Sequence, residues 1–295
     1  MGPASLWRRL TRGRLFDPDH PMPPGPVGSF VGLGILVALA VAISVPMYWM
    51  VVTAITPTGM TAKFPPDLFP SDPTLRNLQE ILERRHFWNW VANSTFMAVV
   101  LTLATLVLGS MAGYAFAKIP FRGSKALFWL HIVAMMLPFE VILVPLFILV
   151  SRMGLVDTHA GLVVPLLASP FAVFLMKQFI QTLPTELMDS ARIDGANEFQ
   201  IYTLVVLPLI RAGLAFLGII TFVNTWNVFV WPLVVTRSSE MRTLQVGLAL
   251  VREEVPLFYA LHMAGAVIAA APVVLVFFAF QRYFLRGVTV GAVKG

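Results

Sequence analysis

Long stretches without charge are the feature of this sequence that most constrains its fold. No Asp, Glu, Lys or Arg occurs at residues 20–62, 86–117, 158–176, 212–236 or 255–281, and a sixth stretch, 126–151, holds only Glu140. A helix that crosses a bilayer needs about 20 mostly apolar residues. The sequence therefore predicts an all-α integral membrane protein with six transmembrane helices. We place these spans at residues 28–53, 91–117, 126–150, 160–181, 209–235 and 261–282.

The composition of the chain excludes several other classes of protein. Only 12% of its residues are charged and 58% are hydrophobic, whereas roughly 25% are charged in soluble domains. The chain has no cysteine, and its five histidines lack the spacing of a helical metal site, so we expect no metal site and no catalytic residue. No G-x-x-x-x-G-K-[ST] sequence is present, so we expect no cofactor and no ATP hydrolysis in this chain. The net charge of +6 does not indicate nucleic-acid binding, because the basic residues lie between the apolar stretches, as expected in a membrane protein.

Basic residues indicate how the predicted spans are oriented. The first apolar run is about twice the length of a signal-peptide core and ends in Tyr48 and Trp49, so we interpret it as a retained span. Alternate connecting segments carry 13 basic and 6 acidic residues on one side of the membrane, against 8 and 8 on the other. The positive-inside rule then places both termini in the cytoplasm. The predicted parts are a cytoplasmic tail at 1–27, an extracytoplasmic loop at 54–90, a transmembrane core at 91–282 that holds the other five spans, and a cytoplasmic tail at 283–295.

One cytoplasmic segment, residues 182–208, is neither short nor of the composition typical of disorder. Pro184 suits the first turn of a helix, Gly195 suits a stop or a sharp turn, and Asn197 suits the cap of a second short helix that ends near Pro208. The segment therefore predicts a helix–turn–helix knob onto which a cytoplasmic partner could dock. The alternative is an amphipathic loop that lies on the membrane surface.

The same segment resembles the EAA loop of permease subunits of ATP-binding-cassette importers. In that pattern, E-A-A is followed after three residues by Gly and after nine more by I-x-L-P. The matching positions are Asp189-Ser190-Ala191, Gly195, Val205 and Leu207-Pro208, with Asp, Ser and Val as departures. Resemblances to the maltose-type branch lie at Phe64–Pro70, Asn77, Met136–Pro138, Gly154–Thr158, Trp226-Asn227, Trp231–Leu233 and the tail from Gln281.

This resemblance implies the fold of a type I (MetI-like) importer permease in a bacterial inner membrane. It implies a heterodimer with a second, homologous permease, two ATPase subunits that bind ATP and Mg²⁺ and dock at 184–208, and an extracytoplasmic solute-binding protein. The expected solute is a sugar, with a di- or oligosaccharide favoured. The residues expected to couple to the ATPase are Glu186, Asp189, Ser190, Ala191, Asp194, Gly195, Ala196, Leu207 and Pro208.

Polar residues inside the predicted spans are candidates for the substrate pathway. Glu140 is the only charge within the six charge-poor stretches; it could line a cavity, bind sugar hydroxyls or stabilise an unwound helix near Pro138 and Pro145. Alternatively, it could lie near the outer interface or pair with the sister subunit. Amide and aromatic groups in the fifth span suit sugar binding, although helix–helix packing is an equal alternative. These candidates are Asn224, Trp226 and Asn227.

Two further functions remain open at this point. The same machine could import glycerol-3-phosphate or a polyol, although the spans lack the mid-depth Arg or Lys that a phosphate would favour. A self-contained secondary transporter would show broken helices and several intramembrane charges.

Finally, Gly109 and Gly113 form a small-xxx-small motif in the second span, which predicts close helix packing.

Overall fold

The computed structural model describes residues 26–58, 68–254 and 258–292, and every regular element in these ranges is helical. Residues 1–25 of the predicted tail 1–27, residues 59–67 and 255–257 of the external segments, and the last three residues lie outside the described residues. The chain divides into two compact units, Met1–Trp49 and Met50–Gly295. In the first unit, the described residues form one apolar helix, the beginning of α2 (Pro26–Ala54).

The spans divide into continuous and bent helices. Within the described ranges, α2, α4 (Phe87–Lys118) and α15 (Tyr259–Ala292) are long and apolar enough to cross a membrane. Three further pairs of helices pass the same test together, each bent by more than 40° at a short break. Counting each bent pair as one span gives the six spans that the sequence predicts.

The third predicted span is bent. It consists of α5 (Ser124–Met136) and α6 (Phe139–Arg152), which meet at 102°. Pro138 explains the break, because proline has no N–H to donate and biases the residue before it towards extended backbone, as at Leu137 (ψ 118°). Pro145, the second proline considered for unwinding, lies inside α6 without ending it.

The fourth and fifth predicted spans are also interrupted. The fourth consists of α7 (His159–Val163) and η2 (Val164–Leu166), followed after a 46° bend by α8 (Pro170–Gln181). The fifth enters from α11 (Leu207–Leu209) through an 80° bend into α12 (Arg211–Asn227). Extended backbone at Val228 then separates α12 from α13 (Val230–Val235).

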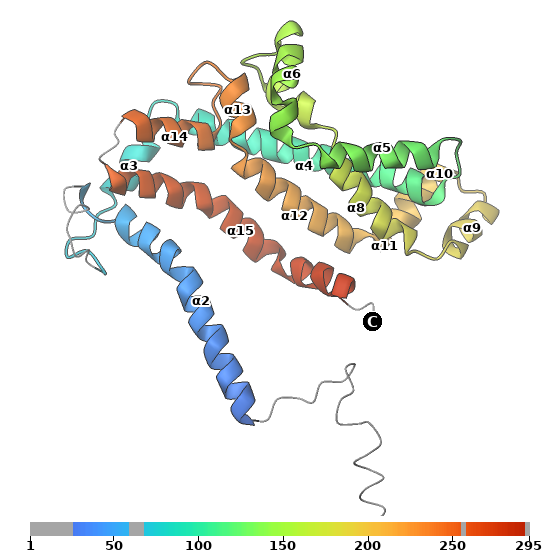
Figure 1. Ribbon diagram of the computed structural model, residues 1–295, viewed down its shortest axis with the longest axis horizontal. Helices are drawn as coiled ribbons and strands as arrows, with labels where there is room; N and C mark the ends of the chain where they lie inside the picture. Colours follow the sequence, from blue (N-terminus) through green and yellow to red (C-terminus); the bar gives the residue numbers. More distant parts are fainter. Residues whose placement is uncertain (1–25, 59–67, 255–257, 293–295) are drawn as a thin grey trace, which may run out of the picture. The chain divides into compact units, whose positions relative to one another are not determined.

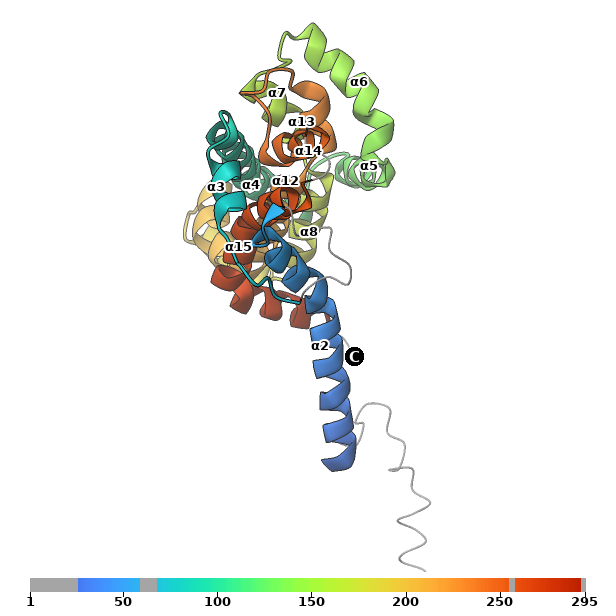
Figure 2. The same ribbon diagram turned by 90° about the vertical axis from the view of Figure 1, so that its left-hand side faces the viewer.

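Four helices, α4, α8, α12 and α15, form the packed bundle of the second unit (Figures 1 and 2). Helices α4 and α8 approach each other closely, because a Cβ on Gly109 would lie 2.7 Å from the Cβ of Ala172 and one on Gly113 would lie 2.7 Å from that of Met176. Only glycine permits this separation, which confirms the predicted packing role of the motif.

The short helices gather at the two ends of α4. In Figure 1, α9 (Glu186–Ile193) and α10 (Glu198–Gln200) lie at one end, followed by the π-helical segment η3 (Ile201–Val206). At the other end lie α3 (Arg76–Leu82) and α14 (Leu244–Glu254). Both views show α6 projecting away from the bundle (Figures 1 and 2).

Candidate functional site

The segment 182–208 folds as the helix–turn–helix knob that the sequence predicts. Asn197 caps α10 by accepting a hydrogen bond from the backbone N–H of Gln200 (2.9 Å), and the Gln200 side chain accepts one from the N–H of Asn197 (2.9 Å). Such a capping box satisfies two N–H groups that a helix start leaves unpaired. The second short helix thus has a fixed starting point.

The turn between α9 and α10 depends on Gly195. This residue has φ +84°, a left-handed conformation that disfavours residues with a side chain. Its N–H donates to the carbonyl of Arg192, and the N–H of Ala196 donates to that of Ala191, both at 3.0 Å. These two bonds form a Schellman motif, which ends α9 and reverses the chain. Ala191 and Ala196 pack side by side against the core beneath the knob.

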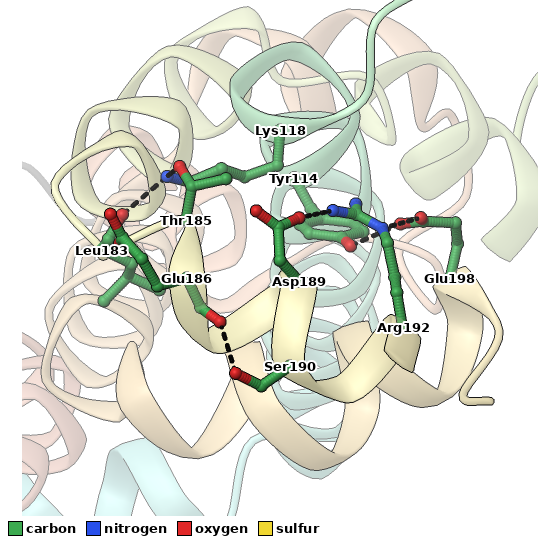
Figure 3. A network of polar contacts seen from close by, with 9 residues as sticks. All are labelled: Tyr114, Lys118, Leu183, Thr185, Glu186, Asp189, Ser190, Arg192 and Glu198. Carbon is green, nitrogen blue, oxygen red and sulfur yellow. Dashed lines mark hydrogen bonds and ion pairs between the residues drawn. The ribbon is translucent and has the colours of Figure 1, made fainter. Parts of the chain in front are cut away.

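Ionic contacts hold the two arms of the knob together (Figure 3). Arg192 donates from Nη1 to Asp189 (2.7 Å) and from Nε to Glu198 on the other arm (2.9 Å). The Arg192 guanidinium and the hydroxyl of Tyr114 hold the pKa of Glu198 below its usual value. These groups are partly exposed, so each contact contributes modestly to stability. Their main effect is to fix the orientation of α9 against α10.

Three side chains on one face of α4 bind the knob to the bundle. They are spaced four residues apart, which aligns them along a helix. Lys118 donates to the carbonyl of Leu183 (2.6 Å) and to the hydroxyl of Thr185 (3.2 Å), before α9. Tyr114 donates to Glu198 (2.6 Å), and the hydroxyls of Ser110 and Tyr202 lie 2.7 Å apart. The knob is therefore joined to α4 as well as to the chain on either side.

Sequence reasoning did not identify these α4 residues as part of the site. Lys118 reads most simply as an orientation signal, and Tyr114 and Ser110 lie in an apolar helix. The available signal was their four-residue spacing, but the partners lie 65 to 92 residues away along the chain. Such partners can be assigned only once the fold is known.

The expected coupling residues divide between two faces of the knob. Glu186, Asp189, Ser190, Asp194 and Gly195 are exposed on its outer side, as is Pro208 at the end of the segment. By contrast, Ala191, Ala196 and Leu207 pack against the core. Both alanines are half-buried and support the turn from beneath. The outer side also exposes Ile193, at 87%, and Phe199, at 65%.

The candidate pathway residues do not form one cluster. Glu140 is exposed in the first turn of α6, immediately after the break at Pro138. Trp226 points into the core, where its indole donates to the carbonyl of Ala269 on α15 (2.9 Å). Asn227 donates to the carbonyl of Val223 (2.8 Å). Of the three candidates on α12, Asn224 alone lines a cavity between α4, α8 and α12.

A rigid segment at the opposite end of the bundle was also missed by the sequence analysis. Asp157 has φ +60° and accepts hydrogen bonds from the N–H groups of Arg237 and Ser238 (2.8 and 3.0 Å). Burial opposes ionisation, but these bonds outweigh it and hold the pKa of Asp157 below its usual value. From α4, Trp90 and Asn93 donate to carbonyls at 239, 240 and 242. The segment 236–243 is thus held from two sides.

Within the ranges that the structure describes, no three His, Asp or Glu side chains lie together as ligands of an ion. The knob presents a surface with fixed geometry, and the bundle presents interrupted helices around a cavity.

Comparisons with known proteins identify the family. Residues 105–290 match the family described as "Binding-protein-dependent transport system inner membrane component". An arabinooligosaccharide transport system permease protein of Halalkalibacterium halodurans is 42% identical over 77% of this chain and 81% of that protein. An sn-glycerol-3-phosphate transport system permease protein of Brucella abortus is 31% identical over 89% of this chain and 96% of that protein.

Similarity to solved structures supports the same fold. A chain of a bacterial transporter that imports the acidic polysaccharide alginate superposes with a TM-score of 0.77, at 23% identity, over 90% of this chain and all of that one. The interrupted spans thus belong to a known permease fold. The chain belongs to the binding-protein-dependent transport system inner membrane components, the permease subunits of ATP-binding-cassette importers.

Proposed function

We propose that this permease carries a neutral di- or oligosaccharide across the inner membrane, driven by ATP hydrolysis on separate ATPase subunits that bind ATP and Mg²⁺. The solute is delivered by an extracytoplasmic binding protein, and the translocation path is completed by a second, homologous permease. The rigid knob at 182–208 is the observation that carries this proposal. Its turn is fixed by Gly195, and its outer side is exposed.

The knob has the properties that force transmission requires. A flexible loop would absorb the motion of a docked partner, whereas this one is held by a Schellman motif, a capping box and ionic contacts. Its exposed Ile193 and Phe199 suit insertion into a groove, with Glu186, Asp189 and Asp194 as polar contacts around them. Closure of the ATPase dimer would then move the spans between inward- and outward-facing arrangements.

A second candidate solute is sn-glycerol-3-phosphate, because the Brucella relative that covers most of this chain is a permease for it. The arabinooligosaccharide relative is closer in sequence, at 42% identity. A polyol would need the same kind of neutral contacts as a sugar. Because the relative of higher identity transports arabinooligosaccharides, we rank the neutral oligosaccharide above sn-glycerol-3-phosphate.

Reconstitution distinguishes these functions. The chain is purified with its sister permease, ATPase and binding protein, placed in liposomes, and supplied with labelled arabinotriose or sn-glycerol-3-phosphate. We expect arabinotriose uptake that requires both ATP and the binding protein. Preferential uptake of sn-glycerol-3-phosphate would instead make it the first candidate for the solute. Accumulation of either solute by this chain alone, driven by an ion gradient, would refute the importer proposal.

A further inference from the structure

A cavity of about 340 Å³ lies between α4, α8 and the end of α12. Its polar lining consists of Thr105 from α4, Ser169 from the turn before α8, and Thr221, Asn224 and Thr225 from α12. Ligand pockets commonly measure about 300–1,000 Å³, so the volume suits one or two sugar rings rather than a long chain.

Interrupted helices form part of this cavity. Ser169 lies at the 46° bend before α8, and Val228, another lining residue, begins the extended step after α12. In secondary transporters, solutes bind where broken helices meet near the middle of the membrane. In any membrane protein, non-helical backbone at that depth is tolerated only against protein or a water-filled cavity. The position of the cavity therefore suits a translocation path.

The polar groups of the cavity have spare hydrogen-bonding capacity. Among the described residues, none forms a hydrogen bond with the side chains of Thr105, Thr221, Asn224 or Thr225. Each threonine hydroxyl can donate one bond and accept two, and the asparagine amide can both donate and accept. Thr105 is nearly fully buried, at 3% exposure. A ligand that offers several hydroxyl groups would satisfy this set.

The charge of the lining selects the class of ligand. No Asp, Glu, Lys or Arg lines the cavity, whereas a phosphate is recognised by Arg, by Lys or by free N–H groups at a helix start. The start of α8 offers few such groups. Pro170 has no N–H, and the N–H of Ala172 is taken by Ser169 (3.3 Å to its hydroxyl). Phe171 instead offers an apolar ring against which a sugar face can lie.

We propose that this cavity binds a neutral, hydroxyl-rich solute during translocation, with Thr221, Asn224 and Thr225 as its hydrogen-bonding contacts. This inference rests on the proposed importer function and adds the residues that select the solute. Trp226 and Asn227 are not among these contacts, because neither lines the cavity and each donates to a protein carbonyl.

Transport kinetics test the proposal. Thr221→Val and Thr225→Val remove a hydroxyl with little change of shape, and each should raise the arabinotriose concentration for half-maximal uptake about two- to tenfold. Thr102→Val is the matched control on α4. It lines a separate apolar cavity, and its buried hydroxyl has no hydrogen-bond partner among the described residues, so uptake should not change.

Thiol labelling provides a second measurement that does not depend on the transport rate. Since the chain has no cysteine, Thr221→Cys introduces its only thiol, and a small methanethiosulfonate reagent that labels this chain, separated from the other subunits after the reaction, reports on position 221 alone. In the assembled transporter with its binding protein, arabinotriose should slow labelling at position 221. Co-purification of all subunits verifies that each variant assembles.

The outcomes separate this proposal from the function on which it rests. If the wild-type complex takes up arabinotriose with ATP but both valine variants keep the wild-type half-saturation and position 221 is unprotected, the cavity proposal is wrong and the importer function stands. ATP-driven uptake of sn-glycerol-3-phosphate alone would also overturn the neutral-solute proposal. A wild-type complex that moves neither solute with ATP would instead contradict the proposed function.

Discussion

The turn at Gly195 gives a direct test of coupling, because the chain contains a matched control. Gly195 (φ +84°) and Gly123 (φ +85°) are both left-handed, and a Cβ added to either meets no atom within 4 Å. Valine at either position therefore introduces backbone strain without a clash. A left-handed residue with a side chain costs about 1–2 kcal/mol, and the more restricted unfolded chain offsets about 0.4–1 kcal/mol. The net loss of stability is about 1 kcal/mol at each site.

The two substitutions should differ in their effect on coupling. Relief of strain at Gly195 weakens the bonds to the carbonyls of Arg192 and Ala191 and changes the orientation of α9. Gly123, by contrast, precedes α5 outside the knob. We expect Gly195→Val to lower the amount of solute transported per ATP hydrolysed in proteoliposomes, and Gly123→Val to keep the wild-type ratio. Equal ratios for both variants, or a wild-type ratio for Gly195→Val, would refute the coupling role of the turn.

Three further predictions concern the supports of the fold. Tyr114→Phe removes the bond to Glu198 and should cost about 0.5–1 kcal/mol, with increased ATP hydrolysis per solute transported. Gly109→Ala places a Cβ 2.7 Å from that of Ala172; it should lower thermal stability by about 1–3 kcal/mol, measured by unfolding in detergent. The bonds to Asp157 lower its pKa, so they stabilise the folded protein fully above about pH 4, and this stabilisation is lost as the pH falls through the native pKa. Measuring the free energy of unfolding from pH 5 to pH 2 tests this.

Each of these predictions has a control. Tyr259→Phe removes the hydroxyl of an exposed side chain on α15 and should change neither solute transport nor ATP hydrolysis. Gly218→Ala meets its nearest atom at an ordinary 3.6 Å and should be tolerated. Asp157→Asn should remove the acid dependence attributed to this carboxyl. If Gly218→Ala destabilises the protein as much as Gly109→Ala does, the argument from the α4–α8 separation fails.

Several parts of the fold could be predicted because they depend on local chemistry. Charge-free stretches locate the spans, since a charge within hydrocarbon costs several kcal/mol wherever the helix packs. The knob was predictable for a similar reason. Gly195 and Asn197 act through backbone conformation and capping within a few residues, so the sequence contains all the groups involved.

Other features depend on tertiary contacts and could not be predicted. Trp226 and Asn224 lie two residues apart on α12, yet one bonds to α15 and the other lines the cavity. Sequence periodicity distinguishes the two faces of such a helix, but it does not show which face packs against another helix and which one lines a cavity. The break at Pro138 is an intermediate case, because proline indicates where a helix can end but not the angle of 102° that follows.

The attachment of the knob to α4 constrains how its motion can reach the cavity. Lys118, Tyr114 and Ser110 distribute the contacts over eight residues, which is about 12 Å of helix. A knob held in this way moves with α4 as a body, so a change of angle must occur where the helices are already interrupted. In the two spans that adjoin the knob along the chain, these points are the bend at Ile210, the turn at Ser169 and the extended step at Val228. Since Ser169 and Val228 line the cavity, rotation at these breaks would reshape it directly, and force applied at the knob would alter how tightly a solute is held.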